Sequence, residues 1–357
     1  MAVLSEEQSM LRDMAQDWVN NESPVSAFRK LRDSGSRQGF DPAVYAEMAS
    51  MGWTGIVIPE AYGGTDFGWF SLGLVLEELG RTLTPSPLAS SSAAAAAIVL
   101  GGSDEQKDKW LPRIAAGEIV ATLATDEGPR HGQGAIETRH FDGKLFGRKQ
   151  FVDNGDSADL FVVLASDGWY LVDGGSAGLT RSTRSMTDSR SHAEIGFDSV
   201  PATKLDCGGE GLTDTILDQA RILCAIEMLG MCRQLFDVTL DYLKQRIQFD
   251  QVLASFQALQ HRMAALFTEI ELTRSAVEGA LAALDNGGDI SVTAAQAKAL
   301  ANDMLNTMSR EAIQLHGGIG MTDEFDVGLY IKRARILENA FGNSAFMRDR
   351  FAQLLAF

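Results

Sequence analysis

The hydrophobic period of this chain changes twice along its length, and that change constrains the fold more than any other feature. From about residue 6 to 116, apolar side chains recur with a helical period that prolines interrupt. From about 119 to 212 the pattern shortens to apolar runs of strand length, and after Thr213 the helical period returns in long segments. Helices, then strands, then helices is typical of an α+β protein rather than a doubly wound sheet. The expected domains are 1–118, 119–212 and 213–357.

Glycine-containing pairs mark the expected breaks between these segments. In the middle region, Asp-Gly pairs separate the short runs and indicate turns of an antiparallel β domain; they are Asp142-Gly143, Asp167-Gly168 and Asp173-Gly174. In the last region, breaks between helices are expected at Gly287-Gly288 and Gly317-Gly318. The Ala-rich stretch from Ser90 to Leu100 is too short to span a bilayer, so it predicts a buried helix.

The composition excludes several classes of function. A chain of 357 residues that is 45% hydrophobic can bury a large core. Its formal charge of −17 disfavours nucleic acid as a partner, because phosphates need a basic surface. The absence of a long apolar run and of a leader-like N-terminus predicts no membrane partner. Cys207, Cys224 and Cys232 have no metal-binding or redox spacing, and we interpret them as reduced thiols of a cytoplasmic protein.

Two motifs in the last region contain residues suited to binding a ligand. The segment Gln314-Leu315-His316-Gly317-Gly318-Ile319-Gly320 ends a long helical pattern. Its glycines allow positive φ and let the backbone approach a ligand without a Cβ in the way. Upstream, Arg246-Ile247-Gln248-Phe249-Asp250 precedes Phe256-Gln257, which opens another helical run. Together the two motifs resemble the C-terminal helical domain of the acyl-CoA dehydrogenase family.

The rest of the chain carries the same resemblance, because its blocks follow the family's order over nearly the whole length. They include 51–56, 59–64, 77–81, 102–107, 110–112 and 116–118. The resemblance implies an N-terminal helical domain, a middle antiparallel β domain and a C-terminal four-helix bundle. It also implies FAD, whose ADP half would be held across a subunit interface by Arg246, Phe249, Gln257, Gln314, Gly317 and Gly318. Alternatively, Arg246 is one charge on an exposed helix and Gln314 is a helix C-cap.

The residues that face the flavin in this family are only partly kept. Thr125 stands where the family has the threonine of a T-E-P-G segment that touches the isoalloxazine ring. Phe151 replaces the tryptophan that covers the flavin, and Asp153 replaces a threonine that hydrogen-bonds it. An ionised carboxylate cannot donate a hydrogen bond as a hydroxyl does. We therefore expect a degraded flavin half beside an intact ADP half.

The catalytic base expected of the family is missing from both of its usual places. Abstraction of the α-proton of an acyl-CoA thioester needs a carboxylate whose pKa an apolar pocket raises. Most members carry it in a loop where this chain has Phe341, and others just before an arginine, where this chain has Ala220-Arg221. Arg221 is then expected to orient CoA or the base region, or else to form a structural salt bridge.

Three acids are substitutes for the missing base, each with a structural alternative. Glu227 lies two helical turns beyond Ala220 in an apolar setting, and its alternative is an ion pair across a helix interface. Asp218 precedes the apolar part of the helix and is expected in solvent. Glu338 lies near Phe341, and its alternative is an ion pair with Arg335. His261 and His316 are expected to be packing or surface residues, and no metal site is expected.

These observations predict a subunit of an FAD-dependent acyl-CoA dehydrogenase that makes a trans-2-enoyl-CoA. Because the bases are missing, the chain is expected to work in an α2β2 assembly with a paralogous subunit, an arrangement the family associates with bulky substrates such as steroid side-chain CoA esters. A homo-oligomer is the alternative assembly, and an electron-transfer flavoprotein is the expected electron acceptor. The net charge means that a site for anionic CoA must be locally basic. The alternative functions are a non-catalytic binding homologue and an enzyme that uses Glu227 as an unusual base.

Overall fold

The computed structural model describes residues 3–205, 207 and 209–357 of the chain. They form two compact units. The helical unit comprises Met1–Val25, Gly73–Thr84 and Arg221–Phe357, and the sheet unit comprises Ser26–Leu72 and Pro85–Ala220. The predicted α+β class is confirmed. The domain bounds predicted from the sequence stay a prediction.

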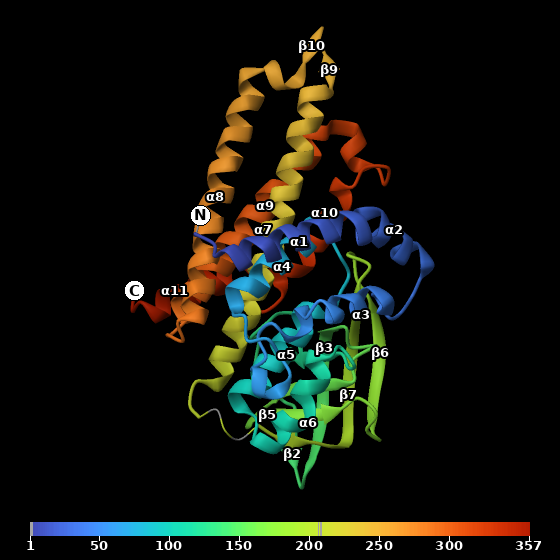
Figure 1. Ribbon diagram of the computed structural model, residues 1–357, viewed down its shortest axis with the longest axis vertical. Helices are drawn as coiled ribbons and strands as arrows, with labels where there is room; N and C mark the ends of the chain where they lie inside the picture. Colours follow the sequence, from blue (N-terminus) through green and yellow to red (C-terminus); the bar gives the residue numbers. More distant parts are fainter. Residues whose placement is uncertain (1–2, 206, 208) are drawn as a thin grey trace. The chain divides into compact units, whose positions relative to one another are not determined.

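Long helices joined by short turns make up the helical unit (Figure 1). Helix α9 packs against α8, α10 and α11, and α7 and α8 run side by side to a hairpin of two short strands, β9 and β10. The breaks expected at Gly287-Gly288 and Gly317-Gly318 lie where α8 gives way to α9 and where α9 ends. The bounds are α1 Glu6–Glu22, α7 Leu212–Gln245 (in this unit from Arg221), β9 Ile247–Gln248, β10 Gln251–Val252, η3 Leu253–Ser255, α8 Gln257–Asp285, α9 Ser291–His316, η4 Gly317–Met321, α10 Val327–Asn339 and α11 Ser344–Leu354.

Helix α4 (Trp69–Arg81) meets α7 at two glycines, which let the two backbones approach closely. A Cβ on Gly230 would lie 1.9 Å from the backbone oxygen of Glu77, and one on Gly80 would lie 2.5 Å from that of Glu227. Both distances are shorter than any van der Waals contact, so neither position accepts a side chain without movement of a helix. The crossing therefore fixes the register of α4 against α7 within the helical unit.

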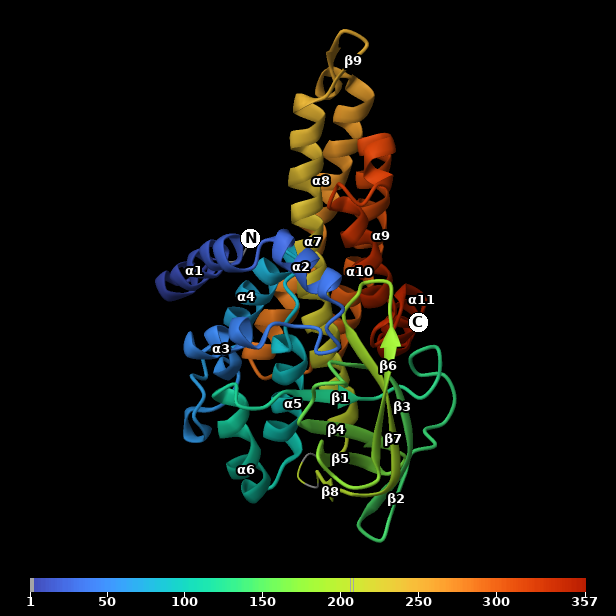
Figure 2. The ribbon, with the colours of Figure 1, turned by 90° about the vertical axis from the view of Figure 1, so that its right-hand side faces the viewer.

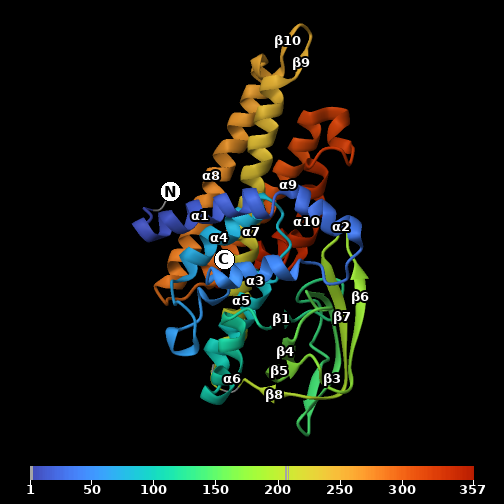
Figure 3. The same ribbon diagram turned by 45° about the vertical axis from the view of Figure 1, so that its right-hand side comes forward.

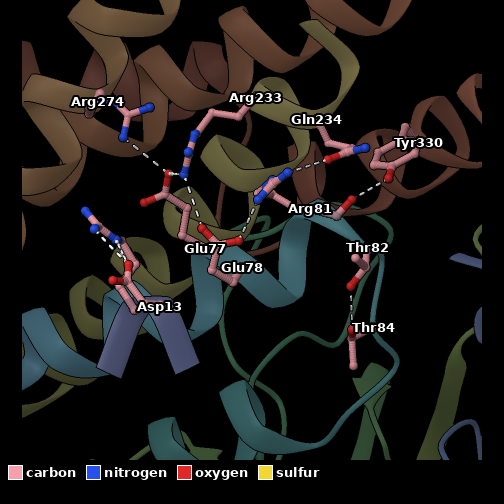
Figure 4. A network of polar contacts seen from close by, with 11 residues as sticks. Asp13, Glu77, Glu78, Arg81, Thr82, Thr84, Arg233, Gln234, Arg274 and Tyr330 are labelled. Atoms are coloured by element: carbon pink, nitrogen blue, oxygen red, sulfur yellow. Dashed lines mark hydrogen bonds and ion pairs between the residues drawn. The ribbon is translucent and has the colours of Figure 1, made fainter. Parts of the chain in front are cut away.

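Ion pairs that are partly or fully buried surround this crossing (Figure 4). Glu77 bonds to Arg233 (Nη1–Oε1 2.6 Å) and Arg274 (Nη1–Oε1 3.3 Å), which lie on α7 and α8. Glu78 is 2% exposed and bonds to Arg81 at 2.8 Å. A buried carboxylate needs such partners, because its desolvation is otherwise unfavourable. The network ties α4 to two long helices of the bundle.

The sheet unit holds two four-stranded sheets and most of the remaining helices (Figure 2). One sheet has the order β1-β4-β5-β8 and the other β2-β3-β7-β6, whose strands β3, β7 and β6 lie side by side in Figure 3. The bounds are β1 Ala121–Ala124, β2 Arg139–Phe141, β3 Lys144–Asp153, β4 Leu160–Ala165, β5 Gly168–Asp173, β6 Leu179–Ser185, β7 Ser191–Pro201 and β8 Thr203–Lys204. The helices are α2 Val25–Ser34, α3 Pro42–Ser50, η1 Trp53–Gly55, η2 Glu60–Tyr62, α5 Leu88–Gly101 and α6 Asp104–Ala115.

The prediction of an antiparallel middle domain needs one correction. Strand β1 pairs in parallel with β4, with Ala121 opposite Leu160, whereas the other pairs are antiparallel. The apolar runs predicted both strands, but the period of a run does not encode its direction. Two of the Asp-Gly pairs close hairpins, β2–β3 at Asp142-Gly143 and β4–β5 at Asp167-Gly168. The Ala-rich segment is the buried helix α5, with Leu100 as its exposed end.

Candidate active site and cofactor-binding residues

The hairpin at the end of α7 presents the first motif to solvent. Arg246, Phe249 and Gln257 are exposed, and Phe249 keeps 83% of its surface accessible. Its ring meets that of Phe256 edge-on at 6.1 Å. Phe249 and Asp250 have φ of 55° and 61°, so the two-residue loop between β9 and β10 has the backbone of a type I′ turn. Arg246 thus stands at the base of a short projecting hairpin, free to approach a phosphate group.

The second motif ends α9. Gly317 has φ of 65°, and its backbone N–H bonds to the carbonyl of Gln314, so Gly317 rather than Gln314 is the C-cap. Gln314, Gly317 and Gly318 are exposed, and a Cβ placed on either glycine would meet nothing within 4 Å. The backbone of this turn is therefore accessible to a ligand.

The structure brings these two motifs to the same end of the helical unit. Tyr242, in the last turn of α7, stacks on His316 at the end of α9, with ring centroids 4.4 Å apart and an interplanar angle of 26°. The Tyr242 hydroxyl donates to the backbone oxygen of His316 at 3.3 Å, and the Tyr242 carbonyl accepts from Arg246 N at 2.9 Å. Sequence reasoning missed Tyr242, because a tyrosine in a helical pattern carries no signal of its own.

The predicted flavin-facing residues lie on neighbouring segments of the sheet unit. The Nζ of Lys149 donates to the carbonyl of Thr125 at 3.0 Å, and Gln150 N donates to that of Asp126 at 2.7 Å. Phe151, the next residue of β3, is 41% exposed. Thr125 and Phe151 are therefore held near one another by backbone and side-chain hydrogen bonds.

Lys149 and Glu127 form the anchor of this region, which sequence reasoning also missed. Lys149 is fully buried and its Nζ lies 2.6 Å from Oε1 of Glu127. Burial lowers the pKa of Lys149, against the raising effect of Glu127. Burial also raises the pKa of Glu127, but hydrogen bonds from Lys149, Thr138 and the backbone of Glu137 lower it, and the net shift is downward. The pair closes the loop between β1 and β2 onto β3.

The loop around Phe341 is held by two buried cations. Arg221, 2% exposed, donates from Nε to the backbone oxygen of Phe341 at 3.0 Å. Lys298 is fully buried, and its Nζ donates to Asn302 Oδ1 (2.7 Å) and to the carbonyls of Leu337 (2.9 Å) and Gly342 (3.3 Å). Burial lowers the pKa of Lys298 to about 8. Arg221 was expected near this loop, but Lys298 was missed, because a lysine in a helical pattern is usually a surface residue.

The substitute acids have other partners. Both carboxylate oxygens of Glu227 accept from Arg333, at 2.8 Å from Nε and 2.9 Å from Nη2, which is the ion-pair alternative. Glu338 pairs with Arg335 at 2.9 Å, again as the alternative states. The expectation that Asp218 lies in solvent was wrong, since its side chain has no exposed surface. Ala220 is also buried, at 2% exposure.

Three phenylalanines at predicted site positions have a left-handed backbone. Phe151, Phe249 and Phe341 have φ of 52°, 55° and 55°. For a bulky residue this is an unfavourable conformation that persists only where the surroundings impose it, and such residues cluster at functional sites. Each phenylalanine stands at a motif position, in the flavin-facing strand, the hairpin and the base loop respectively. The left-handed backbone thus recurs at one motif position in each of the three segments.

Comparison with known proteins decides the family. The acyl-CoA dehydrogenase N-terminal domain matches residues 5–118, and the acyl-CoA dehydrogenase C-terminal domain matches residues 208–356. The chain is 31% identical over 334 residues to acyl-CoA dehydrogenase IpdE2 of Mycolicibacterium smegmatis, covering 93% of each protein. The chain belongs to the acyl-CoA dehydrogenase family. This confirms the resemblance identified in the sequence.

Solved structures of acyl-CoA dehydrogenases share the whole fold. The Tcur3481-Tcur3483 steroid ACAD, solved as a variant, superposes with a TM-score of 0.91 at 29% identity and covers 98% of each chain. The ChsE4-ChsE5 complex of Mycobacterium tuberculosis superposes with a TM-score of 0.91 over 100% of this chain and 99% of that one. At 23% identity, the second likeness is one of fold.

The family uses FAD, and its members are oxidoreductases of lipid and steroid oxidation. The exposed Arg246 and the open glycine turn fit the ADP part of such a cofactor, and Phe151 is accessible near the segment that contains Thr125. Within the described part of the chain, no group of three or more His, Cys, Asp or Glu side chains could hold a metal ion. No helix among the described residues is long and apolar enough to cross a bilayer.

Proposed function

We propose that this chain is one subunit of an FAD-dependent acyl-CoA dehydrogenase and that a paralogous subunit supplies the catalytic base. The observation that carries the proposal is the absence of a carboxylate at both Phe341 and Ala220. The solved Tcur3481-Tcur3483 and ChsE4-ChsE5 assemblies, each named for two chains, support a heteromeric arrangement, here α2β2. A homo-oligomer is the alternative assembly.

This chain contributes to the cofactor site of the assembly. Arg246 would bind a diphosphate oxygen pair, because its planar fork matches phosphate geometry. Phe249, Gln257 and Gln314 would contact the adenosine side, and the bare backbone of Gly317 and Gly318 would allow close approach. When bound, FAD supplies the acceptor for the hydride that leaves the β-carbon of the thioester. In this family the ADP-binding residues serve a neighbouring subunit, so these residues would act across the interface.

The chemistry requires an α-proton acceptor that this chain lacks. In the reaction the α-proton moves to a carboxylate, the β-hydrogen leaves as hydride, and a trans Cα=Cβ bond forms in the acyl-CoA. Glu227 is a poor substitute, because both of its oxygens take charge-assisted hydrogen bonds from Arg333 that proton abstraction would have to break. Arg221 would act through its hold on the Phe341 loop, where it fixes the wall of the acyl site.

The proposed substrate is a CoA thioester with a bulky acyl group, such as a steroid side-chain ester. The support is the likeness to a steroid acyl-CoA dehydrogenase at 29% identity over 98% of both chains. An electron-transfer flavoprotein is the proposed acceptor of the electrons. The second candidate is a non-catalytic binding homologue, which the open ADP-binding surface argues against, because a protein without cofactor has no use for it.

The experiment is co-expression with a neighbouring paralogue of the same family, followed by flavin counting and an acceptor-reduction assay. The proposal expects a complex with about one FAD per heterodimer, activity only in the complex, and little or no flavin on the chain alone. A chain that forms no complex and turns over acyl-CoA by itself contradicts the partner model. A complex that contains this chain but neither flavin nor activity supports the binding homologue.

A further inference from the structure

His316 belongs to the second motif of the proposed ADP-binding surface and contacts Tyr242, which precedes the first motif on α7. It is 3% exposed, and its ring lies between Tyr242 (centroids 4.4 Å apart) and Phe325 (4.9 Å). Its Nδ1 lies 2.7 Å from the carbonyl of Ala312, one turn earlier on α9. A carbonyl only accepts, so Nδ1 carries the proton and donates. The ring is therefore fixed in one tautomer.

The other ring nitrogen has no partner. Among the described residues, Nε2 of His316 is buried and makes no hydrogen bond. In the tautomer that the Ala312 bond selects, Nε2 is a bare acceptor. A second proton would therefore place a charge and an unsatisfied donor in a buried aromatic setting, which is unfavourable. Burial accordingly lowers the pKa of His316 from 6.5, while the bond to Ala312 raises it less.

The contacts of this histidine form a continuous path from one motif to the other. Arg246 bonds through its backbone N–H to Tyr242, Tyr242 bonds and stacks to His316, and His316 is two residues from Gln314. The hairpin itself makes few contacts, since both of its strands are exposed. The position of Arg246 relative to the glycine turn therefore depends on the stack of Tyr242 on His316.

We infer that His316 is a positioning residue that couples the two halves of the ADP-binding surface, holding the Gln314–Gly318 turn in register with the Arg246 hairpin. The inference rests on the proposed function, because it concerns the same cofactor surface. Neutral His316 keeps the register. Protonation of Nε2 opens the stack, so both motifs loosen together and the ADP diphosphate is bound less tightly.

Charged groups on the helices around His316 are not among the causes of its lowered pKa. The shift in the pKa of His316 is due to burial and to Ala312. On α7, Asp241 and Lys244 pair with each other at 3.7 Å, and Glu311 of α9 pairs with Arg262 of α8. Other charged residues on or next to these segments include Asp237, Arg246, Arg310, Asp323, Glu324 and Asp326.

Hydrogen exchange and FAD binding test the inference, on this chain together with its paralogous partner where FAD retention needs one. His316→Ala removes the stack of Tyr242 on His316. Because an aromatic pair contributes about 0.5–1.5 kcal/mol, the dissociation constant for FAD should rise about threefold to tenfold. In the unliganded chain, His316→Ala should speed amide exchange in both 247–252 and 317–321. His316→Phe keeps the rings stacked, so at pH 7.5 it should bind FAD nearly as the wild type does.

FAD affinity measured as a function of pH distinguishes a positioning role of His316, which depends on its protonation, from a role in packing alone. Because burial lowers the pKa of His316 from 6.5, the wild type should lose FAD affinity only as the pH falls below 6.5, whereas His316→Phe, which has no proton to gain, should show a flatter profile. The matched control is His140→Ala, which removes an equivalent stack on Tyr170 (4.5 Å, 26°) in the sheet unit and should leave both exchange segments unchanged.

Faster exchange in 317–321 alone, or identical pH profiles for the wild type and His316→Phe, overturns the coupling. If Arg246→Ala and Gln314→Ala also leave FAD binding unchanged, the cofactor surface itself is misassigned and the proposed function fails. If those two variants weaken binding while His316→Ala does not, only the role of His316 is wrong.

Discussion

Arg221 donates a hydrogen bond from Nε to the backbone oxygen of Phe341, at 3.0 Å. Arg221 directly follows Ala220, so this bond connects the two positions, Ala220 and Phe341, at which the resemblance leads us to expect a base. The loop around Phe341 is further held by Lys298, which bonds to the carbonyls of Leu337 and Gly342. The loop is thus held in place by hydrogen bonds from two buried cations, and its residue 341 is a phenylalanine.

The first prediction is that this chain alone, saturated with FAD, dehydrogenates acyl-CoA at a rate at least about 10²-fold below that of the assembly, because general-base catalysis contributes about 10²–10⁴-fold. The measurement is acceptor reduction by the homogeneous chain with and without its partner. Phe341→Glu should raise the rate of the isolated chain, since Arg221 and Lys298 already hold the loop. Glu227→Gln should not change the rate of the assembly, and a large loss there would restore Glu227 as a base.

The second prediction concerns the diphosphate of FAD. Arg246→Ala should raise the dissociation constant for FAD in the assembly about 10- to 100-fold, because a hydrogen bond to a charged group contributes about 1.5–3 kcal/mol. Arg246 is exposed, so the melting temperature without FAD should stay the same. Titration of the apoprotein with FAD measures the constant. Arg348→Ala, which removes an exposed arginine of α11, is the control. Equal affinity in both variants removes Arg246 from the site.

The sequence predicted where helices and strands lie better than it predicted how the strands pair. The change of period located the helical and strand regions, and the glycine pairs located the ends of α8 and α9, because backbone conformation is a local property. The parallel pairing of β1 with β4 was missed, since direction depends on where the chain returns from.

Candidate site residues in recognisable motifs were predicted from the sequence, whereas those brought together by tertiary packing were not. Motif positions such as Arg246 and Gln314 were found because their residue types and spacing follow a known pattern. Two other buried charges, Lys298 and Asp218, were not recognised as buried. Lys298 and Asp218 stand in ordinary helical patterns, and only tertiary packing removes them from water. The stack of Tyr242 on His316 joins residues far apart in the chain, and no periodicity reports such a contact.

The third prediction uses the buried lysine. Its pKa is lowered from 10.5 to about 8, so between these values the unfolded chain binds a proton that the folded chain does not. The contribution of Lys298 to stability therefore rises with pH through this window and is lost as the pH falls to about 8, by about 1.4 kcal/mol per pH unit at most. The stability of the wild type relative to Lys298→Met should follow this slope in denaturant titrations at pH 8, 9 and 10.

The slope is the informative quantity, because Lys298→Met removes hydrogen bonds to three oxygens and a buried charge at once, and these effects oppose each other. Lys244→Met, at an exposed position, should show no such slope relative to the wild type. A flat difference for Lys298→Met across the window means that the ammonium is not desolvated as the structure indicates.

The last prediction tests the crossing of α4 and α7. Gly230→Ala would place a Cβ 1.9 Å from the carbonyl oxygen of Glu77, an overlap that backbone atoms cannot relieve without moving a helix. We expect a loss of about 1–3 kcal/mol or more in the free energy of unfolding, because inserted atoms in a packed interior force such shifts. The ion pairs of Glu77 with Arg233 and Arg274 depend on the same approach, so the loss should exceed that of a surface substitution. Gly279→Ala is the matched control: it lies on α8 with nothing within 4 Å of the added Cβ, and it should gain up to about 1 kcal/mol from helix propensity. Urea titration of the two variants beside the wild type gives the comparison, and equal stability of the two would mean that the helices do not cross at Gly230.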